Sequence, residues 1–136
     1  MEYLILTGFT MLILSILLVA AYTKIGQSEK SLDIDAAEKA VNELKRAADF
    51  VYIHGDPTKL TVSVYLPKDI DSEHSYIGDA DGDPGNTINI AMGASGSYTD
   101  VWRWTRGTVT GDMPSTEGYY TVVVKSTSSG DILITF

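Results

Sequence analysis

The chain of 136 residues contains no cysteine. This absence excludes disulfide bonds, a thiolate nucleophile and zinc sites with cysteine ligands. It does not decide the compartment, because an exported protein can dispense with disulfides when something else stabilises it.

Basic residues are scarce. Ten Lys and Arg stand against 18 Asp and Glu, and the formal net charge is −8. Between His54 and Phe136 there are eleven acidic and five basic residues. A nucleic-acid-binding protein needs a basic surface to neutralise phosphates, so we expect no nucleic-acid partner.

Catalytic motifs are also missing. The two histidines, His54 and His74, have no neighbouring nucleophile pattern, and the sequence contains neither a glycine-rich phosphate loop nor a metal-binding histidine pair. We expect a protein that is not an enzyme, with His54 in the last turn of a helix, where partial positive charge is favourable.

Charge is absent from the twenty residues Tyr3 to Tyr22, and Glu2 stands directly before them. About 20 apolar residues can cross the hydrocarbon layer of a membrane. The segment does not read as a secretory signal, because a basic start and a small-residue cleavage site are missing. The first basic residues, Lys24 and Lys30, follow the segment and would place that side in the cytoplasm. That orientation would put the acidic, strand-rich remainder in the cytoplasm, on an inverted anchor. The conflict disappears if a basic leader once preceded this sequence and was removed by processing.

Helical periodicity continues beyond a weak point at Gly26-Gln27-Ser28. Ser31, Asp33 and Asp35 are residue types that restart or cap a helix, whereas Gly55 and Pro57 end one. We predict one nearly continuous helix from about residue 2 to 52, about 75 Å long. Its second half carries an amphipathic stripe formed by Leu32, Ala36, Ala37, Ala40, Val41, Leu44, Ala47, Ala48 and Val51.

The first half of this helix is apolar on every side. Leaving its large side chains in water would forfeit roughly 20–35 kcal/mol, as an upper bound. Lipid or other protein must therefore cover them, and a free soluble monomer is excluded. The estimate is summed over twelve side chains: Leu4, Ile5, Leu6, Phe9, Met11, Leu12, Ile13, Leu14, Ile16, Leu17, Leu18 and Val19.

From Lys59 onward the period changes to two, which is typical of strands. Alternation marks 60–66, 88–92 and 100–104, and the segments 119–125 and 131–136 read as a hairpin. We predict an α+β fold in which a long N-terminal helix packs on a small antiparallel sheet or sandwich. The expected segments are an apolar helix over 1–26, its amphipathic continuation over 27–55, and a β-rich head over 56–136.

One loop in the head resembles a calcium loop. Asp79, Asp81 and Asp83 occupy every second position, as calcium ligands do. However, Pro84 stands where such a loop needs glycine, and Ile90 occupies the twelfth position instead of Glu. The composition also suits a solvated turn, which we favour, with calcium as the alternative. No other cofactor is expected.

Aromatic residues gather around Arg103. Trp102 and Trp104 flank it, and the sequence also contains Tyr98, Tyr119 and Tyr120. Aromatic side chains near arginine can bind sugars or stack at subunit contacts. Because alternate residues of a strand more often fill a core, we favour packing in a core or an interface.

Two stretches carry a resemblance to a known family. "MEYLIL" with its apolar helix, followed by "AADFVYIHGDPTKLTVSVYLP", resembles the archaeal type IV-like pilins that carry class III signal peptides. Their processing pattern is Gln-x-Ser-x-Glu followed by an apolar run. Met1, Glu2, Tyr3 and Leu4 match the last x, the Glu and the start of the run, whereas Gln-x-Ser is not present. The resemblance extends from Met1 to about Pro67.

The resemblance implies a precursor held in the cytoplasmic membrane. A prepilin peptidase would process it, and membrane assembly machinery would move it into an extracellular helical homopolymer with a central bundle of helices and the heads outside. Glu2 would pair with a neighbouring subunit's ammonium or a backbone donor, or would only cap the helix. The implied role is surface adhesion, and the alternative is a single-span surface or sensor protein with an extracellular β-domain. The implied assembly residues are Glu2, Tyr3, Leu4, Phe9, Leu12, Ile16 and Val19.

Overall fold

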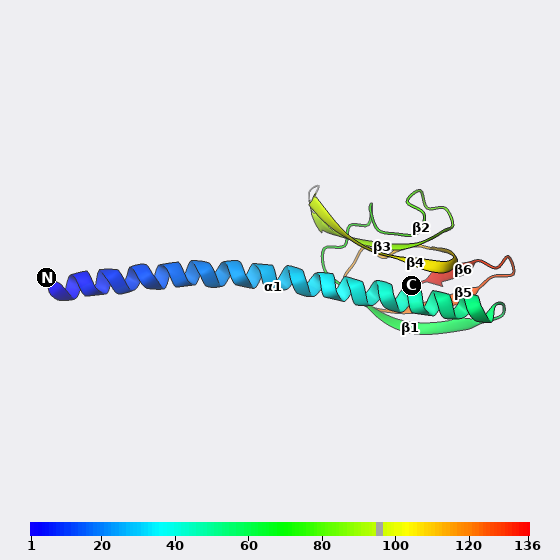
Figure 1. Cartoon of the computed structure of the whole chain (residues 1–136), viewed down its shortest axis with the longest axis horizontal. Coiled ribbons are helices and arrows are strands. Elements are labelled where there is room, and N and C mark those ends of the chain that lie inside the picture. The colour runs from blue at the N-terminus through cyan, green and yellow to red at the C-terminus, as the bar shows by residue number, and fades with distance from the viewer. Residues whose placement is uncertain (95–96) are drawn as a thin grey trace. The chain divides into compact units, whose positions relative to one another are not determined.

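The structure is a computed structural model that describes residues 1–94 and 97–136. Within these ranges it contains one long helix and six strands (Figure 1). In chain order the elements are α1 (Glu2–His54), β1 (Lys59–Leu66), β2 (Tyr76–Gly78), β3 (Gly85–Ala94), β4 (Ser97–Gly111), β5 (Gly118–Ser126) and β6 (Ile132–Thr135).

Helix α1 confirms the predicted continuous helix and extends it to His54. It runs through the weak point at Gly26-Gln27-Ser28 without interruption, so Ser31, Asp33 and Asp35 lie within the helix and neither restart nor cap it. The predicted stop at Gly55 is confirmed. Gly55 adopts a left-handed conformation with φ of 69°, and its N–H donates to the carbonyl of Val51 at 2.9 Å, which satisfies one of the last free carbonyls of the helix.

The chain divides into two compact units. The first, Met1–Leu32, is the apolar part of α1. The second, Asp33–Phe136, holds the remainder of α1 and the strands, and is called the head unit below.

The strands of the head unit form a single sheet in the order β1-β5-β6-β4-β2-β3, with further pairing between β4 and β3. All pairings are antiparallel except that of β4 with β6, which is parallel. The predicted α+β class and the β5–β6 hairpin are confirmed. The parallel pair is a departure from the antiparallel sheet that we expected.

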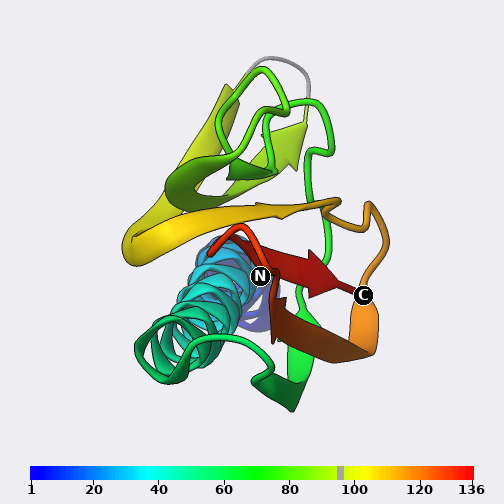
Figure 2. The same ribbon diagram turned by 90° about the vertical axis from the view of Figure 1, so that its right-hand side faces the viewer.

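The core lies between the sheet and residues 33–54 of α1. The sheet curves around this part of the helix, as the view along the helix shows (Figure 2). The amphipathic stripe is confirmed from Ala37 to Val51, whereas Leu32 is exposed. The largest fully buried side chains include Leu44 from the helix and Leu66, Ile88, Ile90 and Ile134 from the strands.

The register of β3 and β4 fixes which side chains share the outer face of the sheet. Thr87 pairs with Trp104, Asn89 with Trp102, and Ala91 with Asp100. Directly paired residues of antiparallel strands point to the same face. Ile88, Ile90 and Val101 point to the other face, into the core.

Candidate functional site

The apolar segment, Tyr3–Tyr22, lies in the first unit and is exposed throughout. The helix is long and apolar enough there to cross a membrane, and none of this part is buried. Glu2 lies in the first turn of α1. The predicted assembly residues all present exposed side chains in this helical unit: Glu2, Tyr3, Leu4, Phe9, Leu12, Ile16 and Val19.

Four hydroxyl groups in this unit, those of Thr7, Thr10, Ser15 and Thr23, bond to the helix itself. Thr7 donates to the Tyr3 carbonyl at 2.6 Å, and Ser15 donates to the Met11 carbonyl at 2.9 Å. Thr10 and Thr23 also donate to carbonyls one turn earlier. Such back-bonding satisfies a hydroxyl without an outside partner. Apolar surroundings can therefore cover the segment without leaving these hydroxyl donors unpaired.

The aromatic residues near Arg103 do not lie in the core, so that part of our interpretation is wrong. Trp102 is 47% exposed and Trp104 is 62% exposed. They stand on the outer face of β4, with ring centroids 5.7 Å apart and ring planes at 87°. Tyr98, on the same face, is also exposed.

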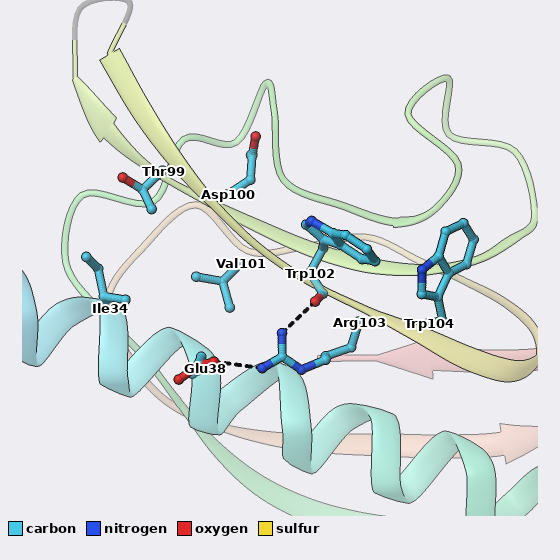
Figure 3. Close-up of a pocket in the computed structure, with 8 residues that line it drawn as sticks. All are labelled: Ile34, Glu38, Thr99, Asp100, Val101, Trp102, Arg103 and Trp104. Atoms are coloured by element: carbon cyan, nitrogen blue, oxygen red, sulfur yellow. Dashed lines mark hydrogen bonds and ion pairs between the residues drawn. The ribbon is translucent and has the colours of Figure 1, made fainter.

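Arg103 points the other way, toward α1 (Figure 3). Its guanidinium donates to Glu38 Oε1 at 2.7 Å and to the Trp102 carbonyl at 2.8 Å. A hollow of about 460 Å³ lies here, lined by Ile34, Glu38 and residues 99–104. Both charged side chains are partly exposed, so the ion pair adds at most about 1 kcal/mol of stability.

A second hollow, of about 320 Å³, is lined by Tyr76, Thr87, Asn89, Asp100, Trp102 and Trp104. The Asn89 amide nitrogen donates to the His74 carbonyl at 2.9 Å and to Asp100 Oδ1 at 3.2 Å. These two bonds fix the orientation of the amide. Its oxygen, Oδ1, is buried and has no hydrogen-bond partner among the described residues. Sequence reasoning missed Tyr76, Thr87, Asn89 and Asp100, although period-two alternation in 98–104 could have placed Asp100 on the same face as Trp102 and Trp104.

The remaining tyrosines lie on β5. Tyr119 is 81% exposed and packs against Tyr65 of β1, with ring centroids 4.9 Å apart. Tyr120 is half-buried against Phe136 at 5.8 Å. The six residues grouped from the sequence thus fall on two regions of the sheet, and only Tyr98, Trp102 and Trp104 share the outer face of β4.

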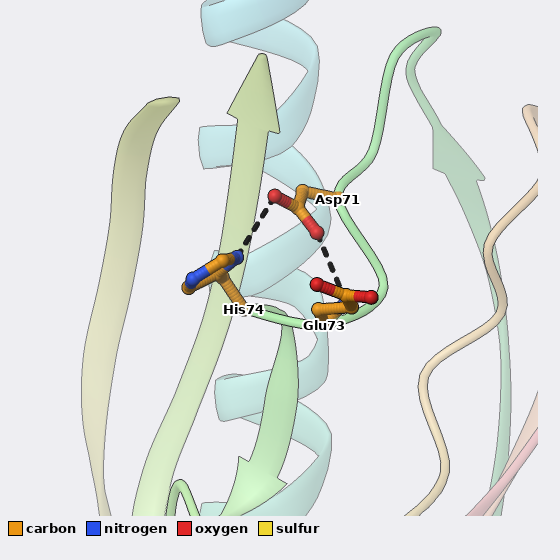
Figure 4. Close-up of side chains that lie close together, drawn as sticks. All are labelled: Asp71, Glu73 and His74. Carbon is orange, nitrogen blue, oxygen red and sulfur yellow. Dashed lines mark hydrogen bonds and ion pairs between the residues drawn. The ribbon is translucent and has the colours of Figure 1, made fainter. Parts of the chain in front are cut away.

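A third cluster comprises Asp71, Glu73 and His74 (Figure 4). His74 Nδ1 lies 2.8 Å from Asp71 Oδ2, and the Glu73 N–H donates to Asp71 Oδ1 at 2.9 Å. The hydrogen bond from His74 is the main cause that holds the pKa of Asp71 below its ordinary value of 3.8. The His74 ring also stacks on Tyr98 at 4.4 Å.

The oxygens and nitrogen of this cluster lie within 4.8 Å of one another, as metal ligands would. However, the imidazole nitrogen that faces Asp71 acts as a donor, so a metal ion would have to displace its proton. Exposed acidic groups with this spacing are common without an ion. We therefore interpret the cluster as a hydrogen-bonded turn.

The loop of Asp79, Asp81 and Asp83 lies between β2 and β3, and all three residues are exposed. The Asp79 N–H donates to the Asp83 carbonyl at 2.8 Å, and Asp79 Oδ1 accepts from the Ala80 N–H at 2.7 Å. Among the described residues, the three carboxylates do not form a group within 4.8 Å. The solvated turn stays our prediction for this loop, with calcium binding as the alternative.

Comparison with protein-family models, with curated proteins and with solved structures gives no match for this chain.

Proposed function

We propose that this chain is a structural subunit of an extracellular archaeal type IV-like pilus that serves surface adhesion. It assembles through the apolar segment and presents the head unit to the surroundings. Before assembly it resides in the cytoplasmic membrane, where a prepilin peptidase and the assembly machinery act on it.

The observation that carries the proposal is the exposure of the apolar segment. Its twelve large apolar side chains are all exposed, and their burial is worth roughly 20–35 kcal/mol as an upper bound. Identical helices offer each other matching apolar surfaces, and the self-bonded hydroxyls permit such packing.

Glu2 supports a filament over a permanent membrane anchor. An acidic side chain costs about 2.5–3.5 kcal/mol at the centre of a membrane span on insertion scales, and less at its end, where Glu2 lies. Pairing with an ammonium or backbone donor of a neighbouring subunit relieves this cost. In a single span, the carboxylate has no neighbouring subunit and can only cap its own helix.

A single-span surface or sensor protein is the second candidate, because α1 is long and apolar enough to cross a membrane. Electron microscopy of material sheared from the native cells separates the two. A pilus subunit appears in the sheared fraction as filaments. A single-span protein stays in the membrane fraction, and that result contradicts our proposal.

The role of Glu2 is tested by Glu2→Ala, with Asp35→Ala as the matched control. Asp35 is another exposed acid of α1, but it lies in the head unit. We expect Glu2→Ala to be made and processed but poorly incorporated, whereas Asp35→Ala assembles normally. If Glu2 only stabilises the start of the helix, by about 0.3–1 kcal/mol, filament yield will be unchanged in both variants.

A further inference from the structure

We propose that the hollow on the outer face of β3 and β4 binds an uncharged saccharide. This inference deepens the proposed adhesive function, on which it rests for its biological setting. It names the chemical class of ligand that the head unit recognises. This cavity is called the aromatic hollow below. It is lined by Tyr76, Thr87, Asn89, Asp100, Trp102 and Trp104.

The first observation is the exposure of two tryptophans on one strand face. The ring planes of Trp102 and Trp104 make an angle of 87°, so the two rings line the aromatic hollow with differently oriented surfaces. The face of an aromatic ring is negative, and the C–H groups on a sugar ring are weakly positive. Sugar rings therefore stack on such surfaces, and a packing role in the head unit does not account for side chains this exposed.

The second observation is an acceptor that lacks a donor. Asn89 is only 5% exposed, and its Oδ1 has no partner in the described part of the chain. Buried polar groups are nearly always hydrogen-bonded, so each exception calls for an explanation. Both amide hydrogens already point at His74 O and Asp100 Oδ1, so the free oxygen can only accept. Because this oxygen is buried and two hydrogen bonds hold the amide, a sugar hydroxyl can donate to it only if these bonds shift.

Charge narrows the ligand class. None of the six residues that line the aromatic hollow is basic, and Asp100 contributes a carboxylate that accepts hydrogen bonds from hydroxyls. Arg103 lines the first hollow together with Asp100, Trp102 and Trp104, but it is paired with Glu38 beside α1 (Figure 3) and does not line the aromatic hollow. An uncharged sugar fits this arrangement, whereas a uronic acid would be repelled by Asp100.

The size of the aromatic hollow agrees with a small ligand. Its volume of about 320 Å³ is at the lower end of the roughly 300–1,000 Å³ that ligand pockets occupy. A single sugar ring, or the end of a longer chain, is the occupant of this size that also brings hydroxyl donors.

Tryptophan fluorescence reports binding on this face of β4, because the chain has only two tryptophans and both line the aromatic hollow as well as the first hollow. The full chain is held in a zwitterionic detergent, since a detergent with a sugar headgroup would compete. The probes are the methyl glycosides of glucose, galactose, mannose and N-acetylglucosamine, with glucuronic acid as the charged control. We expect a saturable fluorescence change at millimolar concentrations of at least one neutral probe, and none with glucuronic acid.

Three variants assign the binding to the aromatic hollow, with calorimetry as a second readout. We expect Trp104→Ala to weaken binding about tenfold or more, as removal of an aromatic anchor does. Tyr76→Ala, at a residue that lines the aromatic hollow but not the first hollow, weakens binding severalfold. Tyr119→Ala, which removes an exposed aromatic ring on β5, leaves the affinity unchanged. Circular dichroism confirms that each variant is folded.

The proposal is overturned if no neutral probe binds, or if Trp104→Ala binds as tightly as the unaltered chain. It is also overturned if the tryptophans mediate only self-association of the chain. Because the assay uses dispersed chains, its failure leaves filament assembly untouched, and a failure to find filaments does not alter the binding result.

Discussion

Gly107 of β4 lies directly against the ring of Tyr52 on α1, with no room for a side chain between them. A Cβ placed on Gly107 would overlap Cδ2 of that ring. Both residues belong to the head unit, where the absence of a side chain at Gly107 makes room for the ring.

We expect Gly107→Ala to destabilise the head unit by about 1–3 kcal/mol, because overpacking forces the ring or the strand to move. In the Tyr52→Ala background the same change should be neutral or stabilising by up to about 1 kcal/mol, since glycine is unfavourable within a strand. Urea unfolding followed by tryptophan fluorescence measures both. Gly111→Ala is the matched control: its Cβ would meet the carbonyl of Ile134, so Tyr52→Ala cannot relieve it.

Leu12 should be inaccessible to water on the cell. The chain has no cysteine, so Leu12→Cys and Ser128→Cys each introduce a single thiol. A hydrophilic maleimide applied to intact filaments or cells should label Ser128→Cys, which lies in an exposed turn, and spare Leu12→Cys. Equal labelling would show that the apolar segment is not covered.

Acid should loosen the turn of Asp71 and His74. The pKa of Asp71 is lowered in the folded state, so this carboxyl contributes stability above pH 3.8, and the contribution is lost as the pH falls through the lowered pKa. Asp71→Asn should abolish this dependence below pH 3.8. Nuclear magnetic resonance of His74 and of Tyr98, which stacks on it, reports the change locally. An unaltered acid profile in Asp71→Asn would contradict the assignment.

The Glu38–Arg103 pair should contribute little. A double-mutant cycle with Glu38→Gln and Arg103→Gln is expected to give a coupling of at most about 1 kcal/mol, because both side chains are partly exposed. The coupling should fall further as salt is added. A coupling well above this value would show that the pair is desolvated.

Calcium should leave the loop of Asp79, Asp81 and Asp83 unchanged. Its hydrogen bonds already close the turn, and one of them occupies Asp79 Oδ1. We expect the same melting temperature of the head unit with calcium and with a chelator. A rise with calcium that Asp81→Asn removes would instead establish the calcium site.

Periodicity predicted the elements whose faces differ strongly in polarity. The helix end at Gly55 and the buried faces of β1 and β3 follow from local residue patterns, and the structure confirms them. The short strand β2 was missed, because three residues are too few to establish alternation. Strand β4 extends from Ser97 to Gly111, well beyond the alternation that predicted it, because pairing with β3 and β6 supports it along its length.

The aromatic hollow was predicted only in part. Alternation placed Trp102 and Trp104 on one face, but it could not tell which face meets the helix. That choice depends on Val101 and Arg103, which lie on the side of α1. The place of Asn89 depends on the register between β3 and β4, which is a long-range property.

The position of β6 has a consequence for biosynthesis. It is the last of the six strands to leave the ribosome, yet it lies between β5 and β4 in the sheet. Until Ile132–Thr135 have been translated, those two strands have no common neighbour and the sheet remains open. The head unit therefore completes its fold only after the apolar segment has emerged. A chain cut short before Ile132 would leave one edge of β5 and one edge of β4 without a paired strand.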